Sequence, residues 1–219
     1  MARSGAVQAR TAALNQLDDL LVTAPAELRQ RLTAKTLQGK ARQCADWEPD
    51  PDRLAEPVQA AQSALRSIAR RIHILSDEIR LLERQLSSLV KQVAPRTLSL
   101  VGVGPVHAAQ LLVTAGQNIE RMTGETAFAH MCAAAPVPAS SGKTQRHRLN
   151  HGGNRAANRS LYMIAVVRLR YCTRTRDYSA RRTTEGKSKQ EIIRCLKRYI
   201  VREVFYALRA DLKDLGLAT

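Results

Sequence analysis

Apolar residues between positions 57 and 94 recur at alternating intervals of three and four. The first series is Val58, Leu65, Ile72, Ile79, Leu86 and Val93, and the second is Ala61, Ile68, Leu75, Leu82 and Leu89. This repeat, opened by Pro57 and ended by Pro95, predicts one long helix that buries a coiled-coil seam. The partner of that seam is either the N-terminal helix folded back or a second copy of the chain. Branched residues in the first series and leucines in the second favour a two-stranded contact.

The residues before this helix, 4–45, show a shorter helical pattern. Their apolar stripe is Val7, Leu14, Leu17 and Leu21. Pro25 is expected at the first position of the next helix. The segment 46–52 carries four carboxylates and two prolines, which predicts a solvated turn rather than a metal site.

The segment 98–116 places Gly102-Val103-Gly104 between an apolar turn and a helix. This order is typical of a helix-hairpin-helix element, whose glycines expose backbone N–H groups to a phosphate. The alternative is a plain turn between two helices with glycine caps. Gly102, Gly104 and His107 are the residues expected to contact nucleic acid here.

A last helix is predicted after Gly186. Its apolar stripe is Ile192, Ile193, Leu196, Ile200, Val204 and Leu208, and residues 186–189 are expected to cap it. Further basic residues lie off this stripe and are expected on an outer, phosphate-facing side: Lys189, Lys197, Arg198 and Arg202. Arg168, Arg170, Arg174 and Arg176, which follow an apolar run at 161–167, are expected to continue the same basic face.

The composition agrees with packed helices, because aromatic residues make up only 4% of the chain. The fold expected is all-α, with a helical coiled-coil region at 1–95 and a second helical domain at 96–219. Of the net charge of +16, +13 falls between Ser141 and Asp214, where 19 Lys/Arg stand against 6 Asp/Glu. Such a block points to DNA or RNA as the partner.

Neither a membrane nor an oxidising compartment is indicated. No apolar run reaches the ~18 residues of a spanning helix, and no signal peptide follows Met1, so a cytoplasmic protein is expected. Cys44, Cys132, Cys172 and Cys195 form no Cys-x-x-Cys pair, so neither a zinc site nor a disulfide framework is predicted.

The stretch from Pro136 to Ser160 concentrates the candidate chemistry. Ser140-Ser141-Gly142 is followed by a basic run, and a helix is expected to start near Asn154. A serine hydroxyl among guanidinium and ammonium groups can attack a phosphate whose charge the cations neutralise. The alternative is a basic loop that only grips a nucleic-acid backbone. His147 and His151 have the spacing of a metal pair, but without a third ligand they are interpreted as donors to phosphate.

The order of residues here resembles the C-terminal transposase domain of insertion-sequence transposases of the IS-one-ten type, which are bridge-RNA-guided serine recombinases. The resemblance rests on Ala135-Pro136, four variable residues, Ser141-Gly142, a basic run and Gly153-Asn154-Arg155. It implies that Ser141 is the catalytic serine, with Ser140 a weaker candidate. It also implies DNA and a guide (bridge) RNA as partners, with a homo-oligomer formed through the coiled coil.

The resemblance further implies an N-terminal RuvC-like domain that binds Mg²⁺ through four acidic residues. No such domain is found before the helical block, so we expect a truncated member with no metal or cofactor site of its own, inactive alone. The alternative is a non-catalytic nucleic-acid-binding and oligomerisation module. The residues expected to bind nucleic acid in the second domain are, besides the three named above, Lys143, Arg146, His147, Arg148, Asn154, Arg155, Arg159, Lys187, Lys189 and Arg198.

Overall fold

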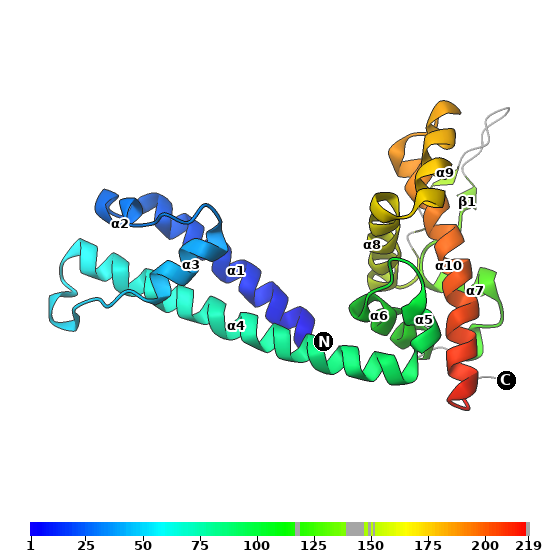
Figure 1. Cartoon of the computed structure of the whole chain (residues 1–219), viewed down its shortest axis with the longest axis horizontal. Helices are drawn as coiled ribbons and strands as arrows, with labels where there is room; N and C mark the ends of the chain where they lie inside the picture. Colours follow the sequence, from blue (N-terminus) through cyan, green and yellow to red (C-terminus); the bar gives the residue numbers. More distant parts are fainter. Residues whose placement is uncertain (117–118, 139–146, 149, 151, 218–219) are drawn as a thin grey trace. The chain divides into compact units, whose positions relative to one another are not determined.

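The structure is a computed structural model that describes residues 1–116, 119–138, 147–148, 150 and 152–217 (Figure 1). These residues form ten α-helices, two short 3-10 turns and one pair of two-residue strands. The predicted all-α class is therefore confirmed. The chain divides into two compact units, residues 1–85 and 86–219, which are described separately below.

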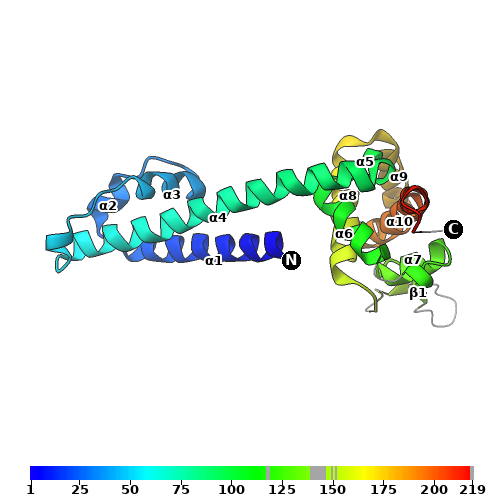
Figure 2. The same ribbon diagram turned by 90° about the horizontal axis from the view of Figure 1, so that it is seen from below.

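The N-terminal unit contains four helices. They are α1 (Ala2–Thr23), α2 (Ala26–Gln30), α3 (Leu37–Ala45) and the long α4 (Pro57–Val93), whose last turns belong to the second unit. Within this unit α1 runs antiparallel to α4 (Figures 1 and 2). Arg3 near the start of α1 donates to Glu83 at 2.9 Å, and Arg71 donates to Gln16 at 2.5 Å.

The first heptad series of α4 is buried where α1 covers it. Leu65 and Ile72 share one apolar cluster with Leu17 and Leu21 of α1, and α3 adds Ala41 and Cys44. The N-terminal helix folded back is thus a partner of the seam. Other apolar side chains of α4 stay open to solvent: Ile74 is 68%, Leu81 48% and Leu89 57% exposed. Self-association through α4 stays a prediction.

Two local predictions in this unit have different outcomes. The predicted turn at 46–52 is confirmed by a 3-10 turn at Pro51–Arg53, which Asp50 caps by accepting the Asp52 N–H at 3.0 Å. The position predicted for Pro25 is wrong by one residue. Pro25 is the N-cap of α2, with an extended ψ of 142° that keeps it outside the helix.

The C-terminal unit contains six helices. They are α5 (Pro95–Ser99), α6 (Pro105–Gly116), α7 (Glu125–Met131), α8 (Arg155–Tyr171), α9 (Thr173–Thr184) and α10 (Lys189–Asp214); η2 (Ile119–Arg121) precedes α7. The strands β1 (Val137–Pro138) and β2 (His147–Arg148) pair antiparallel. Helix α10 packs against α5, α7 and α8, and α6 packs against α8. Large side chains in this core include Phe128, Leu161, Ile164, Ile200 and Leu208.

The buried carboxylate of Asp211 connects the end of α10 to the first turn of α5. Asp211 near the end of α10 is 1% exposed. Its oxygens accept the N–H of Arg96 at 3.0 Å and the N–H and hydroxyl of Thr97 at 2.9 and 2.7 Å. Because these N–H groups belong to the first turn of α5, Asp211 supplies the partners that a helix start lacks.

Arg168 does not continue the basic face as predicted. It is 7% exposed, donates from Nε to the carbonyl of Val101 at 2.7 Å and pairs with Glu203 at 2.6 Å. The prediction failed because Arg168 lies on the side of α8 that faces the 100–104 turn. Here the guanidinium is a structural bridge.

None of the helices in the described part of the chain is long and apolar enough to cross a membrane.

Candidate nucleic-acid interface

The strands β1 and β2 flank residues 139–146, which include the candidate serines, and these two strands pair with each other. Residues 133–136 lead into β1, and Val137 pairs with Arg148 of β2. Ser140, Ser141, Lys143, Arg146 and His151 lie outside the described residues, and of His147 only the backbone is described. The site that the structure defines is therefore built from the described residues on either side of this segment.

Gly153 and Asn154 hold the chain against the end of α7, just before α8 begins. Gly153 has a φ of +87°, and a Cβ atom there would lie 2.4 Å from the carbonyl oxygen of His130. The next N–H, of Asn154, donates to the carbonyl of Met131 at 2.6 Å. Only glycine allows the chain to approach the end of α7 this closely.

Asn154 is the N-cap of α8, which confirms the predicted helix start. Its Oδ1 accepts the N–H groups of Ala156 and Ala157 at 2.9 and 3.0 Å. Its side-chain oxygen is thus occupied by capping. Arg155 and Arg159 are exposed on the same helix and remain candidates for phosphate contact.

Asn158 ties the start of the serine segment to α8 and α10. Its Nδ2 donates to the carbonyls of Cys132 and Ala133 at 3.1 and 2.6 Å. Its Oδ1 accepts a hydrogen bond from Lys197 Nζ at 2.9 Å. Ala133 adopts a φ of +52°, which is unfavourable for a residue with a Cβ atom. The amide of Asn158 therefore stabilises a strained backbone just before Pro136.

Lys197 is a buried cation, although the sequence predicts it on the outer face of α10. It is 5% exposed, and burial, together with the nearby Arg194, lowers the pKa of its ammonium group. One of its three N–H bonds goes to Asn158, and an ammonium group has two more donors that can serve a ligand. An ammonium group held in a site that disfavours its charge is a common feature of functional sites.

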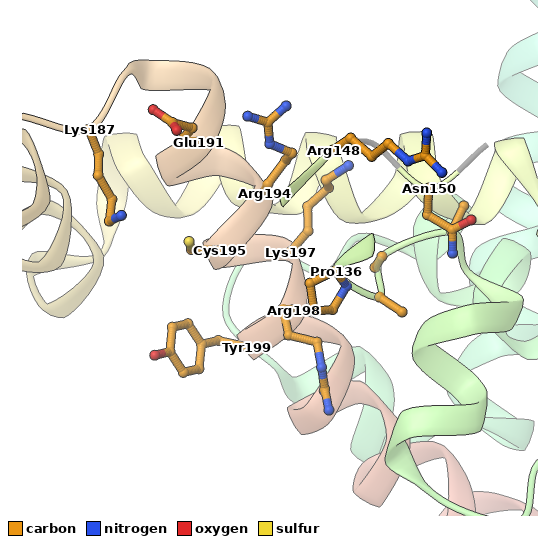
Figure 3. Close-up of a pocket in the computed structure, with 13 residues that line it drawn as sticks. Pro136, Arg148, Asn150, Lys187, Glu191, Arg194, Cys195, Lys197, Arg198 and Tyr199 are labelled. Atoms are coloured by element: carbon orange, nitrogen blue, oxygen red, sulfur yellow. The ribbon is translucent and has the colours of Figure 1, made fainter. Parts of the chain in front are cut away.

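Lys197 lies in a cavity of about 330 Å³ between the 133–136 segment and the first half of α10. Arg148 of β2 lines this cavity together with Arg194 and Lys197 of α10, and Figure 3 shows the Arg148 guanidinium group extending toward Asn150. Lys187 and Arg198 also line it. Five cationic side chains thus line one cavity, which is also lined by Pro136, the residue just before β1.

Glu191 is the one acidic side chain among the described residues that line this cavity. Its carboxylate accepts the N–H and the hydroxyl of Ser188 at 2.9 and 2.8 Å, completing the capping box of α10 and confirming the predicted cap at 186–189. The Ser188 N–H and then its hydroxyl hold the pKa of Glu191 below its usual value. Because this carboxylate is already bonded, the cavity keeps a clear positive excess.

Arg198 links the cavity to α7. Its Nη2 donates to Glu125 at 3.1 Å, and Arg202 pairs with the second oxygen of Glu125 at 2.9 Å. The other terminal nitrogen of Arg198, Nη1, is buried without a hydrogen-bond partner among the described residues. A buried N–H group of a charged side chain without an acceptor is costly, and a phosphate oxygen in the cavity would supply one.

The two glycines of the 98–116 segment have different surroundings. At Gly102, with a φ of +80°, a Cβ would lie 3.3 Å from the Ile164 carbonyl oxygen, so this residue faces α8. At Gly104, nothing lies within 4 Å of such a Cβ. The space beside Gly104 is therefore open, whereas Gly102 packs against α8, and a phosphate contact at either glycine stays a prediction. The helix-hairpin-helix interpretation stays a prediction.

Sequence reasoning missed the roles of Asn158 and Lys197. The periodicity of α10 contained a signal for Lys197, since it stands four residues after Ile193 and four before Val201, both buried. A lysine on the apolar stripe is expected to be buried with a partner or a function. Asn158 carried no comparable signal, because its partners at 132 and 133 are remote in sequence.

Metal ligands are not gathered in the part of the chain that the structure describes. No group of three His, Cys, Asp or Glu side chains there could hold an ion.

A helical unit with a cavity lined by several cations is typical of proteins that bind polyanions. Residues 94–180 match the family model described as "Transposase IS116/IS110/IS902 family". The matched region starts at the end of α4 and reaches into α9, so it contains the serine segment and α8.

Two curated relatives support the same relationship. The chain is 29% identical over 146 residues to the "Insertion element IS110 uncharacterized 43.6 kDa protein" of Streptomyces coelicolor, a match that covers 65% of this chain and 36% of that protein. It is 24% identical over 184 residues to the "Insertion element IS900 uncharacterized 42 kDa protein" of Mycobacterium paratuberculosis, covering 83% of this chain and 45% of that protein. The chain thus matches less than half the length of either relative. Together the comparisons show that the chain is similar to insertion-element proteins of the IS110 type.

Proposed function

We propose that this chain binds DNA in insertion-element transposition and that Ser141 attacks a DNA phosphodiester. A bond forms between the Ser141 oxygen and phosphorus, and one bond from phosphorus to a bridging DNA oxygen breaks. That oxygen leaves as a DNA hydroxyl group, which takes up a proton to balance the one lost by the serine, and a covalent phosphoserine link remains. The observation that supports the proposal is the cavity lined by five cations and by Pro136 and Arg148, which stand before and after residues 139–146 in the chain. Cations at the phosphate oxygens stabilise the charge that develops in such a displacement.

The residues of the cavity have separate tasks in this proposal. Arg148, Arg194 and Lys197 hold the phosphate oxygens, and Arg198 offers its unpartnered nitrogen to the same group. Asn158 acts indirectly, by positioning the backbone that leads to the serine. Further contacts to the phosphate backbone of the nucleic acid come from four other cations, Lys187, Lys189, Arg155 and Arg159. A guide RNA is the expected second partner, with a separate RuvC-like domain supplying Mg²⁺.

The test is a denaturation-resistant protein–DNA adduct. The chain is mixed with cognate DNA, guide RNA, Mg²⁺ and a separate RuvC-like domain, and adducts are resolved by denaturing electrophoresis and mass spectrometry. Ser141→Ala should abolish the adduct and change affinity by less than about twofold, because one hydroxyl adds little to an interface of several phosphates. Ser140→Ala is the matched control and should reduce the adduct only in part.

The second candidate function is a non-catalytic nucleic-acid-binding and oligomerisation module. It is favoured by the charge, since residues 86–219 carry 22 Lys/Arg and 8 Asp/Glu. An adduct on Ser140, or one that survives Ser141→Ala, would show that the nucleophile is assigned wrongly. Salt-dependent binding without an adduct in any mixture would favour the binding module.

A further inference from the structure

A second group of cations lies in the N-terminal unit, outside the region matched by the family model. The unit has 13 Lys/Arg and 11 Asp/Glu, so its net charge is small. Three of its arginines nevertheless converge on one cavity of about 340 Å³ between α1, α3 and α4. They are Arg10 of α1, Arg42 of α3 and Arg80 of α4.

The remaining polar groups around this cavity leave its positive charge in place. Asp77 lines it but is paired with Arg80 of the same helix. His73 and Ser76 are its other polar neighbours on α4, and the Ser76 hydroxyl donates to the Ile72 carbonyl at 2.7 Å. One carboxylate against three guanidinium groups leaves an excess of two positive charges.

Two atoms at this cavity lack partners that they require. Arg10 Nε and His73 Nε2 are buried, and neither has a hydrogen-bond partner among the described residues. Leaving a buried polar atom unpaired is unfavourable by ~1–3 kcal/mol. Clustered like charges add to this cost unless an anion is bound. A tetrahedral oxyanion would supply acceptors to the side chains of Arg10 and Arg42 and to the imidazole of His73.

We propose that this cavity binds one backbone phosphate of a nucleic acid, as a site separate from the interface in residues 86–219. The choice of a nucleic-acid phosphate rests on the proposed function, because a chain that binds a polyanion through one unit presents further phosphates to the other. The cavity itself, its three arginines and its unpaired atoms do not depend on that function. Inorganic phosphate shares the same chemistry and serves as the competing ligand in the test.

Binding of the full chain is measured by fluorescence anisotropy with duplex DNA and with structured RNA, over a series of salt concentrations. Arg10→Gln with Arg42→Gln should weaken binding about five- to tenfold at 0.1 M salt and make the log–log salt slope shallower by about 1, as for one lost phosphate contact. The matched control is Arg29→Gln with Arg31→Gln, which removes two exposed charges of the same unit outside the cavity. This control should change affinity by less than about twofold.

A measurement on the wild-type chain keeps the proposal testable if the double variant fails to fold. An oligonucleotide with photoreactive groups on its phosphates is crosslinked to the protein, and the modified peptides are identified by mass spectrometry. Adducts on the peptides containing Arg10, Arg42 or His73 support the proposal. Crosslinks confined to residues 86–219 overturn it while leaving the proposed function intact.

Thermal melts in inorganic phosphate, against chloride of equal ionic strength, distinguish the two sources of phosphate. If inorganic phosphate stabilises the wild type more than the Arg10→Gln/Arg42→Gln variant while nucleic-acid affinity and slope are unchanged, the site takes small anions and our assignment is wrong. A wild type that binds neither DNA nor RNA would instead contradict the proposed function.

Discussion

Replacing Lys197 by methionine separates the function of this residue from its contribution to stability. The change removes the hydrogen bond from Nζ to Asn158 Oδ1 at 2.9 Å, which as a charge-assisted bond contributes ~1.5–3 kcal/mol. It also removes a charge whose burial is unfavourable and buries a thioether of similar length in its place. The cavity of about 330 Å³ has room for a water molecule to bond the freed amide oxygen. These terms oppose one another, and the free energy of unfolding should change by only about 1 kcal/mol.

The effect on binding should be larger. Loss of one phosphate contact makes the log–log salt slope shallower by ~0.9, so a slope of about −5 becomes about −4, and affinity at 0.1 M salt falls about eightfold. Lys213→Met, an exposed lysine in the last turn of the same helix and outside the cavity, should leave the slope nearly unchanged. Urea unfolding and anisotropy titrations measure the two effects on the same samples.

The pH dependence of stability gives an independent check on Lys197. Its pKa in the folded chain is lowered from 10.5, so folding disfavours the charged form. The destabilisation is complete below the folded-state pKa and is relieved as the pH rises from there toward 10.5. Lys197→Met should lack this rise in stability. The reasoning is refuted if the variant loses several kcal/mol of stability, or if it binds with the slope of the wild type.

Two further predictions concern the backbone and the long helix. Gly153→Ala should destabilise the chain by at least ~2–3 kcal/mol in urea unfolding, because its Cβ would lie 2.4 Å from the His130 carbonyl oxygen at a positive φ. The control Gly152→Ala, where the nearest neighbour of the new Cβ lies at 3.4 Å, should change the free energy of unfolding by less than ~1 kcal/mol. An equal loss of stability in both variants would contradict this account. If α4 also mediates self-association, Ile74→Asp with Leu81→Asp should shift the mass measured by light scattering toward the monomer. The chain should stay folded, because both side chains are exposed. A wild type that is monomeric at high micromolar concentration would show that the exposed face has no partner in a second copy.

Periodicity was sufficient where a structural feature depends on neighbours in sequence. The heptad repeat between two prolines predicted a helix from Pro57 to Ala94, and α4 spans Pro57–Val93. The caps at 186–189 and near Asn154 were predicted from residue type and position. These features depend on hydrogen bonds within one turn and on which face of a helix is apolar. The all-α class and the positive charge of residues 141–214 follow from composition in the same way.

Contacts between residues remote in sequence could be decided only by the tertiary structure. The seam of α4 had two possible partners in sequence, and packing placed Leu17 and Leu21 of α1 against Leu65 and Ile72. The sequence predicted Arg168 and Lys197 to be surface cations. In the fold, Val101 and Glu203 lie beside Arg168, and Asn158 lies beside Lys197. The reason is physical: a side chain's charge and length are local properties, whereas its burial depends on which helices pack over it. The two cation-lined cavities likewise exist only because β2 meets α10 and because α1, α3 and α4 converge.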